Sequence, residues 1–316
     1  MTNAVAIAQS GSNNVTFRNR IINGAMGIDQ RNGGAAISLT NSVGYPVDRF
    51  IAVTATSTTV SFQQSSIAPA NFTKSLSATV TTPKTLAAAD LNRFIHRIEG
   101  FNIADLNWGT ASAQPVTLSF WARASVTGTY TVQIGSGQSY LAAYTINTAN
   151  TWEQKTITVP GSTSGTWPTD NSAGLEINFV LGAGSNWVGV AGAWGGSAIF
   201  TVSGAANWIG TNGATFYITG VQLEKGTAAT SFDYRPYGTE LALCQRYFFK
   251  SISESFAVQS AAYTSYCYKV TMRASPTLTL TPTSGTATVG TQDANGFSAI
   301  GSTGPVGVHI SATAEL

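Results

Sequence analysis

Charged residues are scarce in this chain. Asp, Glu, Lys and Arg make up only 9% of its 316 residues, against roughly a quarter in ordinary globular proteins. The 16 basic and 14 acidic residues leave a formal net charge of +2, and the sequence contains no Lys/Arg cluster that could follow a phosphate backbone. We therefore expect no nucleic-acid partner.

Cysteine and histidine are rarer still. Cys244 and Cys267 are the only cysteines, too few for a disulfide framework and without the paired spacing of a zinc site, so we expect two buried thiols. A Ser-His-Asp hydrolase would depend on His96 or His309, the only histidines. His96 shares one face of an expected strand with apolar residues, which favours a core position. The sequence also contains no G-x-S-x-G elbow and no phosphate-binding fingerprint.

Long apolar runs are absent as well. The stretch from Ala4 to Ala8 is too short for the core of a signal peptide or for a membrane span, and residues 1–18 carry no basic leader. We expect synthesis in a cytoplasm and no membrane insertion. Residues 1–18 also lack a strong period, so we interpret them as an N-terminal attachment arm that packs on a neighbouring protein.

Apolar and aromatic residues, by contrast, are ample for a core. The chain is 43% hydrophobic and holds 15 Phe, 11 Tyr and 7 Trp. Short runs bounded by Gly, Pro, Asn and Ser recur at the spacing of an all-β sandwich. We expect ten strands, at residues 47–55, 58–64, 76–81, 94–99, 116–123, 129–134, 152–159, 175–181, 198–202 and 214–224.

Two of these runs alternate as strands with one core face do. In the first, the core face comprises Val116, Leu118, Phe120 and Ala122, and the other face comprises Thr117, Ser119, Trp121 and Arg123. In the second, the core face comprises Leu175, Ile177, Phe179 and Leu181.

A short helix is expected after the last strand of the sandwich. Pro236 and Gly238 forbid a continued strand or helix, and Thr239 can accept the first free amides of a new helix. The apolar stripe of this helix consists of Leu241, Cys244 and Phe248. It lasts only about two turns, too short to be stable alone in water. The helix therefore needs a partner, and we expect this stripe to mediate oligomerisation.

The sequence after the helix predicts a thin β domain. Its strands carry few large side chains, so roughly 70 residues build only a small core. Association of three chains about an axis would supply the missing burial, and we expect a homotrimer. The expected parts are an arm at 1–18, a sandwich at 19–238, and a helix with a small β domain at 239–316.

Several blocks of the sequence resemble a recurrent module of tailed-bacteriophage virion proteins, found in tail fibres and related appendages. The matching blocks are residues 18–34 (RNRIINGAMGIDQRNGG), Tyr45, 47–50 (VDRF), 116–125 (VTLSFWARAS), 220–226 (GVQLEKG) and 229–248 (ATSFDYRPYGTELALCQRYF). The resemblance implies a jelly-roll sandwich similar to carbohydrate-binding modules, followed by a small C-terminal β domain. It also implies a place on the virion, exposed on the released particle.

A sugar site on such a sandwich needs aromatic faces and hydrogen-bonding amides or carboxylates. Trp187 and Trp194 lie among glycines, Trp208 follows closely, and Trp167 lies in a loop beside Pro168. These four tryptophans are the expected glycan-binding residues. The alternative is that each packs in the core, which is the ordinary place for Trp in a sandwich.

A glycosidase needs two carboxylates that face each other across the scissile bond. The acidic residues that could serve are scattered, and nothing in the sequence brings two of them together: Asp29, Asp48, Asp90, Glu99, Asp105 and Asp170. We therefore expect no catalytic residues and no enzymatic activity. For Asp29 and Asp48 we expect structural duties, such as pairing with Arg31 and Arg49 or capping turns.

A structural calcium ion is the one cofactor considered, because jelly-roll modules similar to this one often hold calcium. Glu224 in the GVQLEKG block is the candidate ligand. A surface Glu224 paired with Lys225 or Arg235 is the alternative. For Arg235 itself, beside Pro236, we expect a role in locking the domain junction.

Two functional classes fit these features. In the first, the protein is a tail-fibre or appendage subunit that contributes to recognition of host-surface glycan. In the second, it is a purely structural fibre or decoration protein of the head or tail. A polysaccharide depolymerase is a more distant alternative. The expected polarity has the arm bound to other virion proteins, the sandwich as the body and the C-terminal domain pointing outward.

Overall fold

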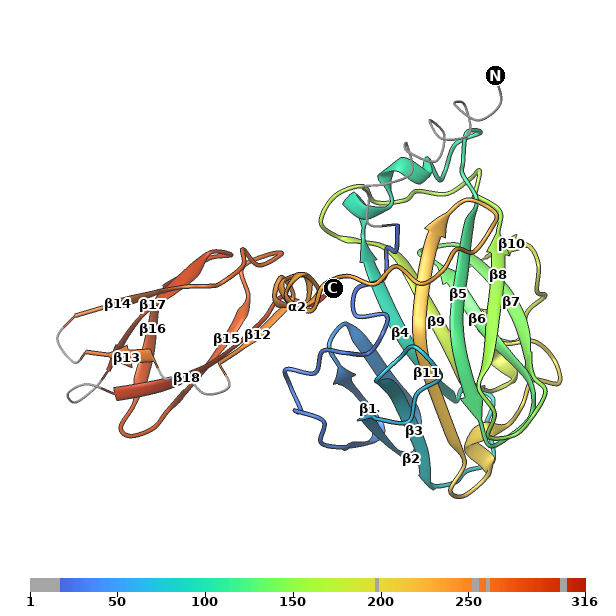
Figure 1. Cartoon of the computed structure of the whole chain (residues 1–316), viewed down its shortest axis with the longest axis horizontal. Helices are drawn as coiled ribbons and strands as arrows, with labels where there is room; N and C mark the ends of the chain where they lie inside the picture. The colour runs from blue at the N-terminus through green and yellow to red at the C-terminus, as the bar shows by residue number, and fades with distance from the viewer. Residues whose placement is uncertain (1–17, 197–198, 252–255, 260–261, 302–305) are drawn as a thin grey trace.

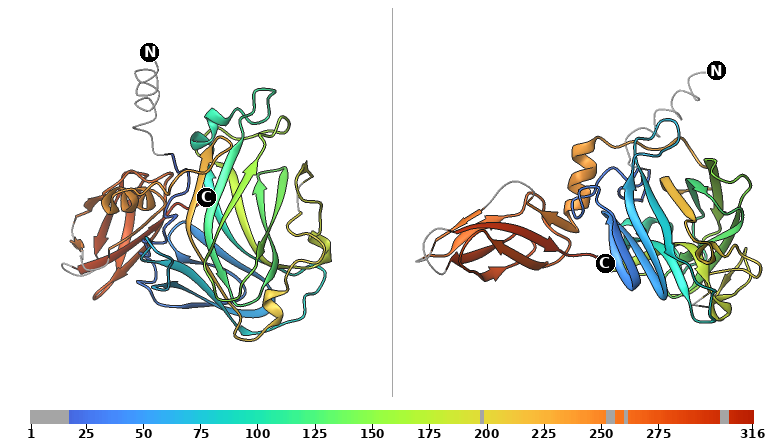
Figure 2. Two further views of the ribbon diagram at one scale, coloured as in Figure 1. Left: turned by 45° about the vertical axis from the view of Figure 1, so that its right-hand side comes forward. Right: turned by 90° about the horizontal axis from the view of Figure 1, so that it is seen from below.

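The computed structural model describes residues 18–196, 199–251, 256–259, 262–301 and 306–316. These residues form a large curled β-sheet, the helix α2 (Tyr237–Gln245) and a small C-terminal β domain (Figure 1). The expected all-β class with a short helix and a small C-terminal β domain is confirmed. The small domain extends away from the large one, and α2 lies at the junction (Figure 2). The expected arm at 1–18 lies almost entirely outside the described residues.

The large domain is a single eleven-stranded antiparallel sheet. Its strand order is β10-β7-β6-β9-β4-β2-β3-β11-β5-β8, with β1 paired to β2. The strands are β1 (Ile37–Val47), β2 (Phe50–Ser65), β3 (Ser75–Thr82), β4 (Leu91–Glu99), β5 (Val116–Ala124), β6 (Gly128–Gly135), β7 (Ser139–Ile146), β8 (Glu153–Val159), β9 (Ala173–Ala183), β10 (Trp194–Gly195) and β11 (Thr215–Lys225). Short 3-10 turns are η1 (Gly100–Asn102), η2 (Ala104–Leu106), η3 (Ser185–Trp187) and η4 (Trp208–Gly210).

The long strand β2 joins the two layers of the sandwich. Its first half, from Phe50 to Ala55, pairs with β4, and its second half, from Thr59 to Ser65, pairs with β3. One layer therefore holds β3, β11, β5 and β8, and the other holds β4, β9, β6, β7 and β10. This explains why two expected strands, at 47–55 and 58–64, are one strand in the structure.

Aromatic side chains fill the space between the layers. The Phe120 ring of β5 lies 5.1 Å from the Phe179 ring of β9 and 5.2 Å from the Tyr144 ring of β7. The two core faces expected from alternation, on β5 and β9, are fully buried as predicted. The buried face of β5 fixes its other face, with Trp121 and Arg123, on the outside of the sandwich.

A bulge in β11 shifts the alternation that the sequence suggests for this strand. The pairing with β5 changes register between Thr219 and Gln222, and Gly220 there has a φ of +61°. Phe216 and Ile218 before the bulge and Val221 and Leu223 after it are buried. Simple alternation would have placed Val221 on the same face as Tyr217, so the bulge keeps the apolar residues in the core.

Some strands differ from the sequence-based expectation. β1 and β7 were not expected, although Tyr140, Tyr144 and Ile146 of β7 are buried at alternate positions. The expected strand at 198–202 does not form a named element. Of its residues, Ala198 lies outside the described residues, and Thr201 forms an isolated bridge with Val188.

The C-terminal domain consists of two small antiparallel sheets. The first contains β12 (Phe248–Lys250), β18 (Val306–Thr313), β13 (Phe256–Val258) and β15 (Thr277–Pro282), and the second contains β14 (Thr264–Cys267), β17 (Gly296–Gly301) and β16 (Ala287–Gln292). Their shared core includes Phe249, Tyr268 and Phe297. Of the two thiols expected to be buried, Cys244 is buried, whereas Cys267 on β14 is exposed. Cys267 shares the exposed face of β14 with Ser265, whereas Thr264 and Tyr266 on the other face are half-buried.

The helix α2 finds its partner within the same chain. Cys244 and Tyr247 pack against Ile22 and Ile28 of the segment that precedes the sandwich strands. Phe248 is also buried, so two of the three residues of the expected oligomerisation stripe are already covered, while Leu241 is half-buried. The association of several chains itself stays a prediction.

The start of α2 also differs from the expectation. The helix begins at Tyr237 with Pro236 at the N-cap, and Thr239 lies inside it instead of capping it. Proline is tolerated here because it has no N–H that would need a partner at a helix start. Glu240 lies in the first turn, where its carboxylate is favourable beside the positive end of the helix. Within the described residues, no helix combines the length and apolar character that crossing a membrane requires.

Candidate functional site

Two of the expected glycan-binding tryptophans lie together, but they pack on each other. Trp167 and Trp194 join Trp108 in a triangle with ring-centre distances of 4.8, 5.3 and 5.6 Å, all edge to face. Trp167 is 7% exposed. Its indole N–H donates to the Ser164 carbonyl at 3.1 Å, and that of Trp194 donates to the Pro160 carbonyl at 2.8 Å. Their faces and donors are therefore largely used inside the protein.

The other two expected tryptophans lie apart from this triangle. Trp208 is completely buried, so its ring offers no face to a ligand in this structure. Trp187 is half-buried, packs edge to face with Phe200 at 5.5 Å and donates its N–H to the Ala89 carbonyl. The four residues thus do not form one surface.

A different set of aromatic residues gathers on the outer side of β8, β5 and β11. Trp121 of β5 stands opposite Gln154 of β8 and Thr219 of β11. One row further along, Arg123 stands opposite Tyr217. The Trp152 ring, just before β8, lies 6.2 Å from the Tyr217 ring. Trp121, Trp152 and Tyr217 are all partly exposed. We call these three residues the aromatic face.

A groove borders the aromatic face at Trp121. Three rings build its far wall: Phe72 lies 5.1 Å from Phe232 and 5.6 Å from Tyr234, and Phe232 lies 4.8 Å from Tyr234. The groove has a volume of about 210 Å³. Tyr234 is 55% exposed, and its hydroxyl donates to the Asn71 carbonyl at 2.5 Å, which holds the ring in place.

Gly220 allows the two walls of this groove to approach. A Cβ atom at this position would lie 2.6 Å from Cζ of Phe72 and 3.1 Å from Cδ1 of Trp121. Both distances are below van der Waals contact. The positive φ at the bulge and the close approach of Phe72 and Trp121 therefore both require glycine here.

Polar side chains complete the groove. Ser119, Gln154 and Ser231 line it beside the rings. Hydroxyl and amide groups next to a partly exposed aromatic ring suit a ligand that presents both an apolar face and hydroxyl groups. No Asp or Glu is among the described residues that line the groove.

Part of this aromatic face could be predicted from the sequence. Alternation in β5 placed Trp121 and Arg123 on the side opposite the core. Phe72, Phe232 and Tyr234 had no such signal, because only the fold brings residues from two distant loops to one strand.

Glu224 serves as a buried hydrogen-bond acceptor. It is 3% exposed and accepts hydrogen bonds from Thr230 Oγ1 at 2.5 Å, the Thr230 amide at 3.0 Å and Gln222 Nε2 at 2.8 Å. The alternative of a surface ion pair with Lys225 or Arg235 is therefore wrong. In the described part of the chain, no group of three or more His, Cys, Asp or Glu side chains could hold a metal ion.

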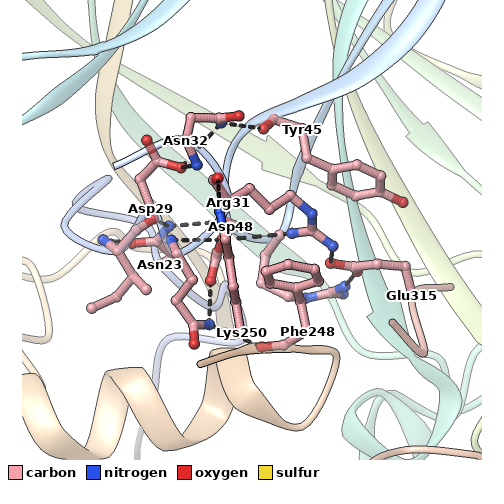
Figure 3. Close-up of polar contacts among 12 residues, drawn as sticks. Asn23, Asp29, Arg31, Asn32, Tyr45, Asp48, Phe248, Lys250 and Glu315 are labelled. Carbon is pink, nitrogen blue, oxygen red and sulfur yellow. Dashed lines mark hydrogen bonds and ion pairs between the residues drawn. The ribbon is translucent and has the colours of Figure 1, made fainter. Parts of the chain in front are cut away.

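Residues 18–34, Tyr45, 47–50 and the end of 229–248 meet at the junction between the two domains (Figure 3). Glu315 bridges Arg31, at 3.0 Å, and Arg49. The Arg31 guanidinium lies 3.7 Å from the centre of the Phe248 ring and 4.2 Å from that of Tyr45. The junction is therefore held by charge, hydrogen bonds and cation–π contacts together.

Asp48 lies at the bottom of this junction. It is fully buried, 3.5 Å from Arg31, and accepts hydrogen bonds from the side chain and amide of Gln30. Burial raises the pKa of Asp48 to about 6, and the Gln30 hydrogen bond and Arg31 oppose that rise. Asp29 caps a turn through the amides of Asn32 and Gly34. The structural duties expected for both aspartates are confirmed.

Further arginines tie α2 and the last residues to the sandwich. Arg235 donates to the carbonyls of Asn19 and Ile21 and pairs with Glu240 at 3.1 Å, which confirms its expected role at the junction. Arg246, just after α2, pairs with Glu99 of β4 at 3.1 Å. His96 is completely buried, and burial lowers the pKa of its imidazole well below the usual range. The expected core position of His96 is confirmed.

Comparison with known proteins gives distant structural likenesses. No protein-family model matches the chain, and neither does any curated protein. Among solved structures, a tailspike protein 4 domain of bacteriophage CBA120 shares 14% identity at a TM-score of 0.34, over 67% of this chain and only 22% of the tailspike chain. A CBM4 module shares 16% identity at a TM-score of 0.32, over 65% of this chain and 99% of the module.

A family 11 carbohydrate-binding module from Clostridium thermocellum gives a similar result, with 16% identity and a TM-score of 0.31 over 62% of this chain and 97% of the module. The large curled sheet thus resembles the jelly-roll folds of carbohydrate-binding modules. Identity and TM-score are both low, so the function has to be argued from this chain's own residues.

Proposed function

We propose that the protein is a non-enzymatic glycan-binding protein and that its sandwich binds saccharide at the aromatic face and the adjoining groove. The observation that carries the proposal is the position of Trp121. Its partly exposed ring lies on the outer surface of the strands, with Gln154 opposite it and the Phe72 and Tyr234 rings across a groove of about 210 Å³.

The physical basis is the amphipathic character of a sugar ring. Its C–H face packs on an aromatic ring, and its hydroxyl groups exchange hydrogen bonds with amides and hydroxyls at the ring's edge. Trp121 and Tyr217 are held by strands, so little conformational entropy is lost when a ligand orders them. A rigid strand surface of this kind suits an extended polysaccharide better than an enclosed small molecule.

The absence of catalysis is part of the proposal. The groove is lined by no carboxylate within the described residues. Four of the six acidic residues considered for hydrolysis each form an ion pair with an arginine or lysine: Asp48, Asp90, Glu99 and Asp105. A hydrolytic pair facing one sugar would need two carboxylates free for that task.

The cellular setting we propose is the surface of a bacteriophage particle, with the chain as a subunit of a tail fibre or another appendage and host-surface glycan as its ligand. Support comes from the sequence blocks that resemble virion proteins. Four of these blocks, namely residues 18–34, Tyr45, 47–50 and 229–248, contribute to the domain junction, so they would keep the body and the small domain in a fixed relation. That rigid junction also favours the second candidate, a purely structural fibre or decoration protein.

Binding of labelled protein to host cells and to purified surface polysaccharide tests the proposal. We expect saturable binding that free polysaccharide competes and that Trp121→Ala weakens by about tenfold or more, as removal of a central aromatic anchor does. Trp187→Ala is the matched control, because it removes a half-buried indole outside the aromatic face. No binding by the folded wild type would favour the structural role. Loss of binding in Trp187→Ala but not in Trp121→Ala would place the glycan site at Trp187 and contradict a site at the aromatic face.

A further inference from the structure

A cation lies in the middle of the aromatic face. Arg123 of β5 stands directly opposite Tyr217 of β11, and its guanidinium carbon lies 5.0 Å from the centre of the Tyr217 ring. Trp152 packs on the same Tyr217 ring, and Trp121 is two residues away on the same side of β5. Any ligand that covers these three rings also covers Arg123.

The pairing of Arg123 differs from that of most other arginines. Six arginines form ion pairs with carboxylates: Arg20, Arg31, Arg49, Arg97, Arg235 and Arg246. Within the described residues, Arg123 has no carboxylate partner. Its Nε donates to the Asn150 carbonyl at 2.8 Å, which fixes the guanidinium. The two terminal nitrogens of Arg123 have no hydrogen-bond partner in the described part of the chain.

The acid on the neighbouring strand, Glu153, lies opposite Ala122 and is already engaged. Glu153 begins β8, next to Trp152, and its carboxylate accepts hydrogen bonds from the amides of Asn147 and Thr148 at 2.8 and 2.9 Å. It also pairs with Lys155 at 2.6 Å. These donors hold Glu153 in the loop that carries Asn150, so it does not neutralise Arg123.

We propose that the aromatic face selects an acidic saccharide and that Arg123 binds the carboxylate of one of its sugar residues. The inference rests on the proposed function and names its ligand class. A planar guanidinium with two free terminal nitrogens matches a carboxylate in a bidentate arrangement. Stacking on Trp121, Trp152 and Tyr217 would hold the sugar rings, while Arg123 would distinguish a uronic acid from the corresponding neutral sugar.

The test compares one oligosaccharide in two charge states. Isothermal titration calorimetry at low salt measures binding of an oligogalacturonate and of its methyl ester, which has the same rings without the charge. We expect the wild type to bind the acid about tenfold more tightly than the ester, the usual range for a charge-assisted hydrogen-bonded pair. Raising the salt concentration should reduce this ratio.

Three variants locate the selectivity. Arg123→Gln should lower the affinity for the acid to that for the ester and leave the ester unchanged, and Arg123→Lys should restore only part of the difference. Lys269→Gln removes the same charge from the small domain and should change neither the affinity for the acid nor that for the ester. Trp121→Ala should weaken acid and ester alike.

The outcomes separate this inference from the proposed function. Equal wild-type affinity for acid and ester, or equal loss of both in Arg123→Gln, would overturn the selection of an acidic saccharide while glycan binding stands. Failure of the wild type to bind either oligosaccharide at millimolar concentration would also overturn it. The proposed function would then be decided by the binding to host cells and their polysaccharide.

Discussion

Glu315 lies 3.0 Å from Arg31, although the two residues are 284 positions apart in the chain. The contact joins the segment that opens the sandwich to the segment that leaves the small domain. Arg49 pairs with the other carboxylate oxygen of Glu315 and stacks on Tyr247 at 3.5 Å. One carboxylate therefore neutralises two largely buried arginines.

Removing this carboxylate should be costly. Glu315→Ala leaves Arg49, whose side chain is 2% exposed, without its carboxylate partner, and we expect a loss of about 3 kcal/mol in the free energy of unfolding. Urea denaturation followed by tryptophan fluorescence measures it. Glu176→Gln is the control, because the Arg97–Glu176 pair is 30% and 27% exposed and should contribute under about 1 kcal/mol. Equal losses in the two variants would mean that the ion pairs of Glu315 stabilise the protein no more than an exposed pair does.

The raised pKa of Asp48 predicts an unusual pH dependence. In the unfolded chain this carboxyl ionises near pH 4, whereas burial holds it protonated in the folded protein up to about pH 6. Between these values the unfolded state has lost a proton that the folded state retains, so this group makes stability fall as the pH rises. Above pH 6 both states are ionised and the cost stays constant.

Asp48→Asn should remove that slope. We expect the difference in unfolding free energy between wild type and Asp48→Asn to change from pH 4 to pH 6 and to level off above it. Carbon-13 NMR of the wild-type carboxyl provides the direct measurement. A midpoint near the ordinary aspartate value would contradict the prediction, because ionisation would then cost nothing in the folded state.

Gly220→Ala should damage the groove more than the fold. The new Cβ would lie 2.6 Å from Cζ of Phe72, and the left-handed φ adds strain of about 1 kcal/mol. We expect weaker saccharide binding and a lower unfolding midpoint. Gly213→Ala is a matched control, since Gly213 has a similar φ of +72° and open space around its Cβ position. It should show the strain without the loss of binding.

The two cysteines should react very differently. Cys267 is exposed and Cys244 is completely buried, and burial raises the pKa of the Cys244 thiol well above its usual range. We expect one thiol per chain to react with a disulfide reagent in the native state and two in denaturant. Two rapid reactions without denaturant would mean that α2 leaves the sandwich readily.

Much of the sandwich could be predicted because its apolar alternation is local. The core faces of β5 and β9 follow from residues within nine positions of each other. The bend of β2 could not be predicted, since only its pairing with both β3 and β4 reveals one strand instead of two. β1 could not be predicted because its alternation breaks at Asn41, which has a positive φ, and its pairing with β2 changes register between Thr40 and Ser42.

Less of the candidate site than of the fold could be predicted from the sequence. Alternation alone places Trp121 outside the core. The groove beside it also needs Phe72 and Tyr234, and Phe72 can come this close to Trp121 only because Gly220 has no side chain. The helix stripe shows the opposite error. The stripe that contains Cys244 correctly predicted that α2 packs against a partner. The sequence could not show whether that partner is a neighbouring chain or the segment at Ile22 and Ile28 of the same chain.

The chain crosses the junction twice, once through α2 on its way into β12 and once through the residues that follow β18. These two strands are hydrogen-bonded to each other, with Phe248 opposite Thr313 and Lys250 opposite Ser311. A bending force applied at the far end of the small domain is therefore shared by the covalent connection through α2 and by the contacts of Glu315 and Leu316 with arginines of the sandwich. We therefore expect the small domain to act as a lever fixed at its base, so that a displacement at its tip reaches the sandwich as torque.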